Sequence, residues 1–189
     1  MGARERMDEE LIDLMVKAGT HHVFYAIESA SPRIQELVHK NLDLERAREI
    51  VNLTASRRIV TGTFYMLGFP TETEDEMAAT VEYAVSLKNH LASFFFLNPF
   101  PGTEIAKSAS WISEKAKDLD FSKNYSGITL NLSAVPDQVM INMKRSAYRR
   151  FYFSPRRISR IVRDIPKTSS LLLYSYIIFR LSFQNYIRR

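Results

Sequence analysis

Polar and turn-forming residues follow three short apolar runs, and these residues could build a ligand site. Glu28 and Ser29 end the first run, Gly68–Pro70 follow the second, and Asn98–Pro99 follow the third. A carboxylate accepts hydrogen bonds, a hydroxyl both donates and accepts them, and a glycine lets a ligand approach the backbone closely. The three segments are therefore the first candidates for function, although Glu28 could also be a plain exposed carboxylate.

Other reactive groups are scarce or have simpler explanations. The chain has no cysteine, which excludes disulfides, thiolate nucleophiles and thiolate-bound metals or clusters. The acidic stretch Glu72–Glu76 could hold a metal, but acidic residues are typical of the first turn of a helix. His21 and His22 precede an apolar run and are expected to be exposed, while His39 and His90 lie near predicted helix ends, where a cation is favourable. No metal site is predicted.

The elements that position the three segments alternate between strand and helix. The strands read as compact apolar runs covered on both faces, which favours parallel pairing with right-handed crossovers. Loops after the carboxyl ends of such strands carry the site in α/β folds. The expected strands are 22–28, 60–67 and 92–97, and the expected helices are 8–18, 31–41, 43–57 and 73–85.

The pattern changes after Thr103. Residues 104–135 show no clear period, Asp137–Phe153 is predicted to be an amphipathic helix, and Ser154-Pro155 begins another helix that runs to about residue 165. The apolar run Leu171–Phe179 is too short for a bilayer, which needs about 20 residues. We therefore divide the chain into an α/β part, a helical extension and a basic and apolar tail: residues 1–103, 104–165 and 166–189.

Three strings resemble motifs of one enzyme superfamily. Tyr25–Ser31 (YAIESAS) is similar to the G-I-E-S-G-S segment that ends the fourth strand of radical S-adenosylmethionine (SAM) barrels. Phe64–Thr73 resembles F-x-x-G-x-P-G-E-T after the fifth strand, and Asn98–Glu104 resembles T-P-Y-P-G-T-E after the sixth. The string AYRRFY at 147–152, followed by Ser-Pro-Arg, resembles the tail of the subgroup with an N-terminal cobalamin-binding domain.

This resemblance implies half of a parallel β/α barrel followed by a helical extension. It implies radical chemistry with S-adenosylmethionine and a 4Fe-4S cluster, often leading to methylation, with cobalamin as a possible further cofactor. Glu28 would accept a hydrogen bond from the cofactor, the backbone of 65–68 would line its adenine, and the turn at 98–103 would shape the substrate mouth. The residues assigned to the cofactor are Glu28, Ser29, Tyr65, Met66, Leu67 and Gly68, and those assigned to the substrate mouth are Asn98, Pro99, Gly102 and Thr103.

The departures from the family pattern imply a catalytically incomplete chain. The cluster motif C-x-x-x-C-x-x-C and the first three strands are absent, and Ala26 and Ala30 stand where the family usually has glycine. Three parallel strands would leave two open edges, so a missing barrel half or self-association is expected to cover them. A gene fragment, a split enzyme completed by a second chain, and an inert product are the alternatives.

The charge of the chain is divided unevenly. Residues 144–189 hold twelve Lys and Arg against Asp164, a net charge of +11, whereas the other 143 residues carry −6. The basic part is interpreted as a solvated helical face, as a contact with an anionic membrane surface, or, with less support, as a nucleic-acid contact. A non-catalytic binding module is therefore the alternative function. The expected location is the cytoplasm, with a possible peripheral contact to the membrane, because residues 1–6 lack the apolar core of a signal peptide.

Overall fold

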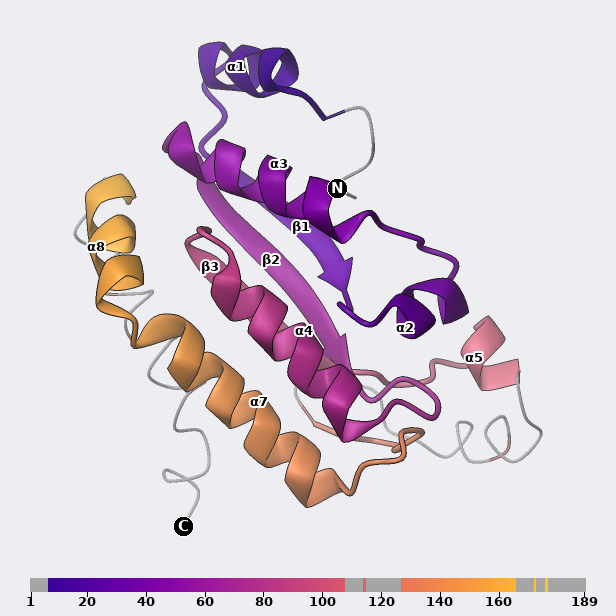
Figure 1. Ribbon diagram of the computed structural model, residues 1–189. Helices are drawn as coiled ribbons and strands as arrows, with labels where there is room; N and C mark the ends of the chain where they lie inside the picture. Colours follow the sequence, from indigo (N-terminus) through magenta and orange to yellow (C-terminus); the bar gives the residue numbers. More distant parts are fainter. Residues whose placement is uncertain (1–6, 108–113, 115–126, 166–171, 173–175, 177–189) are drawn as a thin grey trace.

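A computed structural model describes residues 7–107 and 127–165, together with the single residues 114, 172 and 176 (Figure 1). Most of the stretch 104–126 and of the apolar run Leu171–Phe179 thus lies outside the described residues. The helices are α1 (Glu9–Lys17), α2 (Pro32–Leu37), α3 (Leu44–Ser56), α4 (Glu74–Ser86), α5 (Glu104–Lys107), α7 (Asp137–Tyr152) and α8 (Pro155–Asp164). The strands are β1 (His22–Glu28), β2 (Val60–Leu67) and β3 (Leu91–Phe96).

The predicted helix starts are confirmed by the caps that hold them. The side chains of Asp8, Ser31 and Asp43 each accept a backbone N–H of the first turn of α1, α2 and α3. Thr73 and Glu76 form the predicted capping box of α4. Each cap satisfies a donor that the first turn leaves without an intrahelical partner, so these short polar residues fix where the helices begin.

The three strands form one parallel sheet in the order β1-β2-β3. Helices α3, α4 and α7 lie side by side on one face of this sheet (Figure 1). The connections β1-α3-β2 and β2-α4-β3 are the crossovers expected for parallel strands. The sheet and its helices thus confirm the predicted α/β class.

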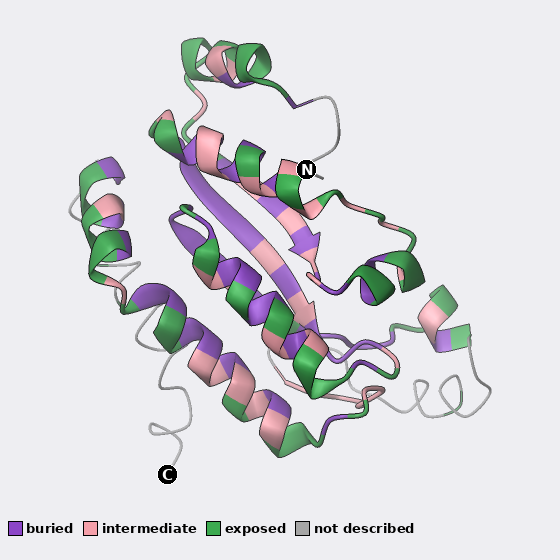
Figure 2. Cartoon of the chain, in the orientation of Figure 1, coloured by how far each residue is buried: buried purple, intermediate pink, exposed green. Residues whose placement is uncertain are grey.

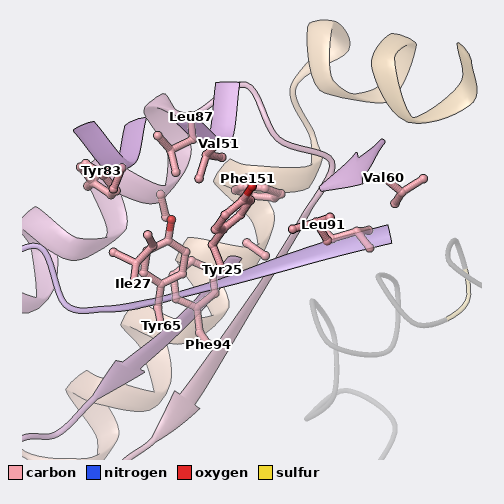
Figure 3. Close-up of a cluster of buried hydrophobic side chains, with 14 of the residues drawn as sticks. Tyr25, Ile27, Val51, Val60, Tyr65, Tyr83, Leu87, Leu91, Phe94 and Phe151 are labelled. Atoms are coloured by element: carbon pink, nitrogen blue, oxygen red, sulfur yellow. The ribbon is translucent and has the colours of Figure 1, made fainter. Parts of the chain in front are cut away.

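The hydrophobic core lies between the sheet and these helices. Tyr25, Tyr65 and Phe94 come from three neighbouring strands and are completely buried there (Figure 3). The rings of Tyr65 and Phe94 stack with centroids 5.2 Å apart. In Figure 2 the buried residues of α3, α4 and α7 face the sheet, while exposed residues line the outer sides of these helices. Alternating strand residues therefore supply the core, as the period of a strand requires.

The opposite face of the sheet is only partly covered. Phe24 and Phe64 stack on this face with centroids 5.2 Å apart, and Phe95 is 37 % exposed. Gly62 makes the stack possible, because a Cβ at this position would lie 2.4 Å from the ring of Phe24. This aromatic face is only half-buried, which corrects the prediction that the strands are covered on both faces.

The prediction of two open sheet edges is wrong for β3. The hydroxyl of Tyr148 in α7 accepts a hydrogen bond from the N–H of Phe94 at 3.0 Å and lies 3.4 Å from its carbonyl oxygen. The hydroxyl of Tyr152 accepts a hydrogen bond from the N–H of Ala92 at 3.0 Å and donates one to the carbonyl oxygen of Ala92 at 2.9 Å. Two side chains thus pair with the backbone groups that an edge strand would leave open. Among the described residues, β1 is the other edge strand of the sheet.

Helix α8 is anchored by a buried arginine. The guanidinium of Arg157 donates to the carbonyl oxygens of Val85, Leu87 and Asn89, at 2.9, 2.8 and 2.6 Å. It also lies 3.5 Å from the centroid of the Phe151 ring. These carbonyls lie in the last turn of α4 and just after it, so Arg157 acts as a cap for that helix. Burial lowers the pKa of Arg157 to about 10, which leaves it a cation at neutral pH.

His90 is part of the same anchor and corrects another expectation. It is fully buried rather than a cation at a helix end, and its Nδ1 accepts the N–H of Thr61 at 3.0 Å. Its Nε2 lies 3.1 Å from Oδ2 of Asp164 in α8. Burial lowers the pKa of His90, so the neutral imidazole with a proton on Nε2 satisfies both partners.

No helix within the described residues is long and apolar enough to cross a membrane.

We expect Tyr148→Phe to lower the free energy of unfolding by about 1–3 kcal/mol, because it leaves a buried N–H on the edge of β3 without an acceptor. Urea unfolding measures this change. Tyr176→Phe is the matched control, since its ring is 61 % exposed, and it should change stability little. Equal stability of the two variants would contradict the role assigned to the Tyr148 hydroxyl.

Candidate cofactor-binding end of the sheet

The three segments singled out in the sequence meet at one end of the sheet. Parallel strands bring their carboxyl ends to the same edge, and the N–H of Leu97 donates to the carbonyl of Leu67 at 2.8 Å just beyond β2 and β3. Figure 1 shows α2 and α5 at this end. Left-handed backbone gathers here: φ is 69° at Glu28, 61° at Thr71 and 88° at Gly102. Such strain concentrates at functional sites, where surrounding contacts maintain it.

Glu28 presents its carboxylate at the end of β1. The register between β1 and β2 shifts between Ala26 and Glu28, so the strand bends at this point. Oε1 of Glu28 forms an ion pair with Nζ of Lys40 at 3.1 Å, and both side chains remain about a quarter exposed. A partly exposed carboxylate held by one ammonium group can still accept hydrogen bonds from a ligand. The cofactor contact assigned to Glu28 stays a prediction.

Ser29 faces the interior of the chain. Its hydroxyl lies 3.2 Å from Oγ1 of Thr80 in α4 and accepts the N–H of Ser31 at 3.1 Å. Gln35 fixes the same turn, because its Nε2 donates to the carbonyl oxygens of Ile27 at 2.8 Å and of Ser29 at 2.5 Å. In this arrangement Ser29 ties the loop after β1 to α4, and its assignment to the cofactor stays a prediction.

The end of β2 offers mainly backbone to a ligand. The side chains of Tyr65 and Leu67 are completely buried on the helix side, whereas Met66 points to the other face and lines a cavity. Gly68 has a φ of 97°, and a Cβ there would lie 3.5 Å from the sulfur of Met140. The adenine contact expected along 65–68 would therefore involve the backbone and the side chain of Met66, and it stays a prediction.

Glu72 was misread from the sequence. It is not a first-turn residue, because α4 begins at Glu74 after the cap Thr73. Its side chain is completely buried, and Oε2 accepts the N–H groups of Gly68 at 2.7 Å and of Phe69 at 3.1 Å. Burial raises the pKa of Glu72 to about 7, although the two N–H donors act in the opposite direction. Glu72 thus shapes the turn after β2 from inside.

Arg33 and Glu76 join three elements around this turn. The guanidinium of Arg33 in α2 donates to both carboxylate oxygens of Glu76 in α4, at 2.8 and 2.7 Å, and to the carbonyl of Thr71 at 3.2 Å. These bonds hold the pKa of Glu76 at about 2. A bidentate pair of this kind fixes direction as well as distance. Sequence reasoning missed Arg33, because nothing near it in the chain marks its partner 43 residues away.

The third loop holds a neighbouring segment and borders two cavities. Oδ1 of Asn98 accepts the N–H of Thr129 at 3.0 Å, and Nδ2 donates to the carbonyl of Gly127 at 3.2 Å. Asn98, Pro99 and Thr103 line a cavity of about 330 Å³ together with Met66. A larger cavity of about 640 Å³ lies between Gly102, Thr103 and the end of α2. The residues predicted for the substrate mouth are thus brought together around open space, and their contact with a substrate stays a prediction.

Comparison with known proteins identifies the class. The profile of the radical SAM superfamily matches residues 3–84, which contain the first two of the three strand ends described above. The match covers less than half of the chain and shows that this part is similar to the radical SAM superfamily. The chain also resembles coproporphyrinogen III oxidase from Escherichia coli, described as a radical SAM enzyme, with a TM-score of 0.54 and 14% identity over 77% of this chain and 30% of that one. That likeness shows the fold, a partial barrel of radical SAM type.

The curated relatives point to methyl-group chemistry in longer proteins. The chain is 29% identical over 163 residues to an uncharacterized methyltransferase of Pyrococcus horikoshii, covering 84% of this chain and 34% of that protein. It is 37% identical over 109 residues to the cytidylyl-2-hydroxyethylphosphonate methyltransferase of Streptomyces wedmorensis, and this match covers 54% of this chain and 20% of that protein. The chain therefore spans about a third or less of the length of these relatives.

We expect Glu72→Gln to change how stability depends on pH. Between the ordinary pKa of 4.5 and about 7, the folded chain keeps a proton that the unfolded chain has lost, so the free energy of unfolding falls as pH rises through this window. Above pH 7, the loss of free energy of unfolding caused by ionising the buried Glu72 is fully present. The neutral amide of Gln does not pay this cost of ionising a buried carboxyl. Between pH 5 and 8, the free energy of unfolding of the variant relative to that of the wild type should therefore rise by up to about 3 kcal/mol, as measured by urea unfolding.

Glu74→Gln is the control for this experiment, because Glu74 is exposed in the first turn of α4. Its pH profile should follow that of the wild type. A Glu72→Gln profile that also runs parallel to the wild type would show that Glu72 is ionised throughout the window.

Proposed function

We propose that this chain supplies the adenosine-facing half of an S-adenosylmethionine site in a radical methyl-transfer enzyme. The observation that carries the proposal is the convergence of Glu28, the Gly68 turn and the Asn98–Thr103 turn at the carboxyl ends of three parallel strands. In this proposal the Glu28 carboxylate accepts a hydrogen bond from the cofactor, and the backbone of 65–68 receives the flat adenine. Gly68 allows the left-handed backbone of this turn.

The 4Fe-4S cluster that the family uses does not fit the residues of this chain. Such clusters are held by cysteine thiolates, and the chain has none. When bound, a cluster of this kind supplies the electron for reductive cleavage of S-adenosylmethionine. Its ligands would have to come from residues outside this chain, so the chain's own contribution is to bind and orient the adenosine end of the cofactor.

Methyl transfer is the reaction that the relatives favour. Two of them are named as methyltransferases, and a third, of Aquifex aeolicus, is named as a tRNA methylthiotransferase. Cobalamin is the finer part of the proposal. It is supported by the likeness of residues 147–156 to the tail of the cobalamin-binding subgroup, and no residue of this chain is assigned to hold it.

The sheet also defines where a completing partner would attach. Helix α7 blocks the outer edge of β3, so a further strand can be added only beside β1. A parallel strand there would place its own carboxyl end next to Glu28, on the same side as the other three loops. We propose that the cysteine-bearing half of the barrel, in another segment or another chain, occupies this edge.

Replacement of Glu28 tests the cofactor site directly. We expect the chain to bind S-adenosylmethionine in equilibrium dialysis, and Glu28→Gln to weaken binding at least about tenfold, because it replaces a charged acceptor. Glu45→Gln is the matched control, since this carboxylate is 80 % exposed on α3 and should not affect binding. Equal affinities of the wild type and Glu28→Gln would refute the role of Glu28.

The absence of cysteine predicts that the chain cannot cleave S-adenosylmethionine by itself. After anaerobic incubation with iron, sulfide and dithionite, we expect no 5′-deoxyadenosine above the protein-free background. Formation of 5′-deoxyadenosine by the purified chain would refute the proposed division of the site between this chain and a cysteine-bearing partner.

A further inference from the structure

Exposed apolar side chains gather in the C-terminal part of the chain. Phe153, Ile158 and Val162 are 56, 47 and 59 % exposed, and Leu172 and Tyr176 farther along are 69 and 61 % exposed. Ile158 and Val162 lie four residues apart in α8, which places them next to each other on the helix surface. Most surface residues of this type occur singly, so a group of them marks an interaction surface.

Helix α8 is built to present this side outward. Its inner side carries Arg157, Ile161 and Asp164, which are buried, and Arg157 and Asp164 are bonded to the end of α4 and to His90. The helix is therefore fixed to the domain by its polar anchors. Ile158 and Val162 lie on an outer flank of the helix and remain exposed.

Basic residues border the apolar side chains of α8. Residues 144–165 hold eight Lys and Arg against one acid, Asp164, a net charge of +7. Arg156 is exposed, and Arg163 lies two turns farther along the same side of α8, so a basic strip lies on this side, with Ser159 between it and the strip of Ile158 and Val162. The guanidinium of Arg163 is bonded to Asp164, so Arg156 is the residue of this strip that can meet an anion. Within the described residues, no acidic side chain lies within ion-pair distance of Arg156. A helix with adjacent apolar and basic strips has the composition of one that lies in a membrane interface.

The other helix with exposed apolar residues lacks this charge. Leu11, Leu14 and Val16 of α1 are exposed to a similar degree. However, α1 carries Glu9, Glu10 and Asp13 against Lys17, and Arg57 pairs with Glu9 and Asp13, so its surface has no excess positive charge to attract anionic lipid. The charge distribution thus separates two otherwise comparable helices and selects α8.

We propose that α8 docks this chain on an anionic lipid surface, with Ile158 and Val162 entering the interface and Arg156 meeting the lipid phosphates. Figure 1 shows α8 beside the amino ends of the strands, while α2 and α5 lie at the carboxyl ends. Docking through α8 therefore leaves the candidate cofactor site pointing away from the membrane and accessible. This surface is independent of the S-adenosylmethionine site.

Vesicle flotation of the full chain tests this proposal. We expect binding to phosphatidylcholine vesicles that contain phosphatidylglycerol, little binding to phosphatidylcholine alone, and release at high ionic strength. Arg156→Gln should weaken binding about fivefold. The double variant Ile158→Ser and Val162→Ser should weaken it on the order of tenfold, because it removes apolar surface from the interface.

Lys17→Gln and Leu14→Ser in α1 are the matched controls and should bind vesicles like the wild type. Urea unfolding of every variant checks that the exposed substitutions leave the fold intact.

The proposal would be overturned if vesicle binding did not depend on phosphatidylglycerol, on ionic strength or on the substitutions in α8. Tighter binding to single-stranded RNA, unchanged in the double variant, would assign the basic strip to nucleic acid instead. A dimer by light scattering that the double variant dissociates would assign the surface to a second copy of the chain.

Discussion

The structure depends on how the outer edge of β3 is closed. A strand at the end of a sheet exposes N–H and C=O groups that need partners. Here the hydroxyls of Tyr148 and Tyr152 bond to these backbone groups of β3. The rings of the same two residues belong to the core between the sheet and the helices. One helix therefore ends the sheet and covers it. Growth of the sheet is then possible only at β1, which is also the strand that ends in Glu28.

The loops at the carboxyl ends of the strands are held by buried polar contacts rather than by apolar packing. Ser29 bonds to Thr80, Glu72 accepts two backbone N–H groups, and Arg33 joins Glu76 to the turn. These bonds compensate for left-handed residues such as Glu28, whose conformation costs free energy. Apart from these interior contacts, Glu28 pairs with Lys40 and stays partly exposed, and Met66 borders a cavity. The loops are thus arranged before any ligand arrives.

Local patterns predicted the elements, and contacts between distant residues decided the rest. Asp8, Ser31 and Thr73 mark helix starts by bonds within four residues, which a sequence shows directly. The same reading misplaced Glu72 in a helix and His90 on the surface, because their environments come from Gly68 and from Asp164, 74 residues away. The closed edge of β3 was missed for the same reason. The period of α7 shows that Tyr148 faces inward, but not that its hydroxyl reaches a backbone.

The two ends of the sheet carry different physical properties. The carboxyl ends gather a carboxylate, strained turns and cavities beside apolar residues, which suits recognition of a small molecule with a polar and a flat part. At the amino ends, Arg157 and Asp164 fix a basic helix whose outer side is partly apolar. A single sheet separates these surfaces, so a partner can occupy one without covering the other.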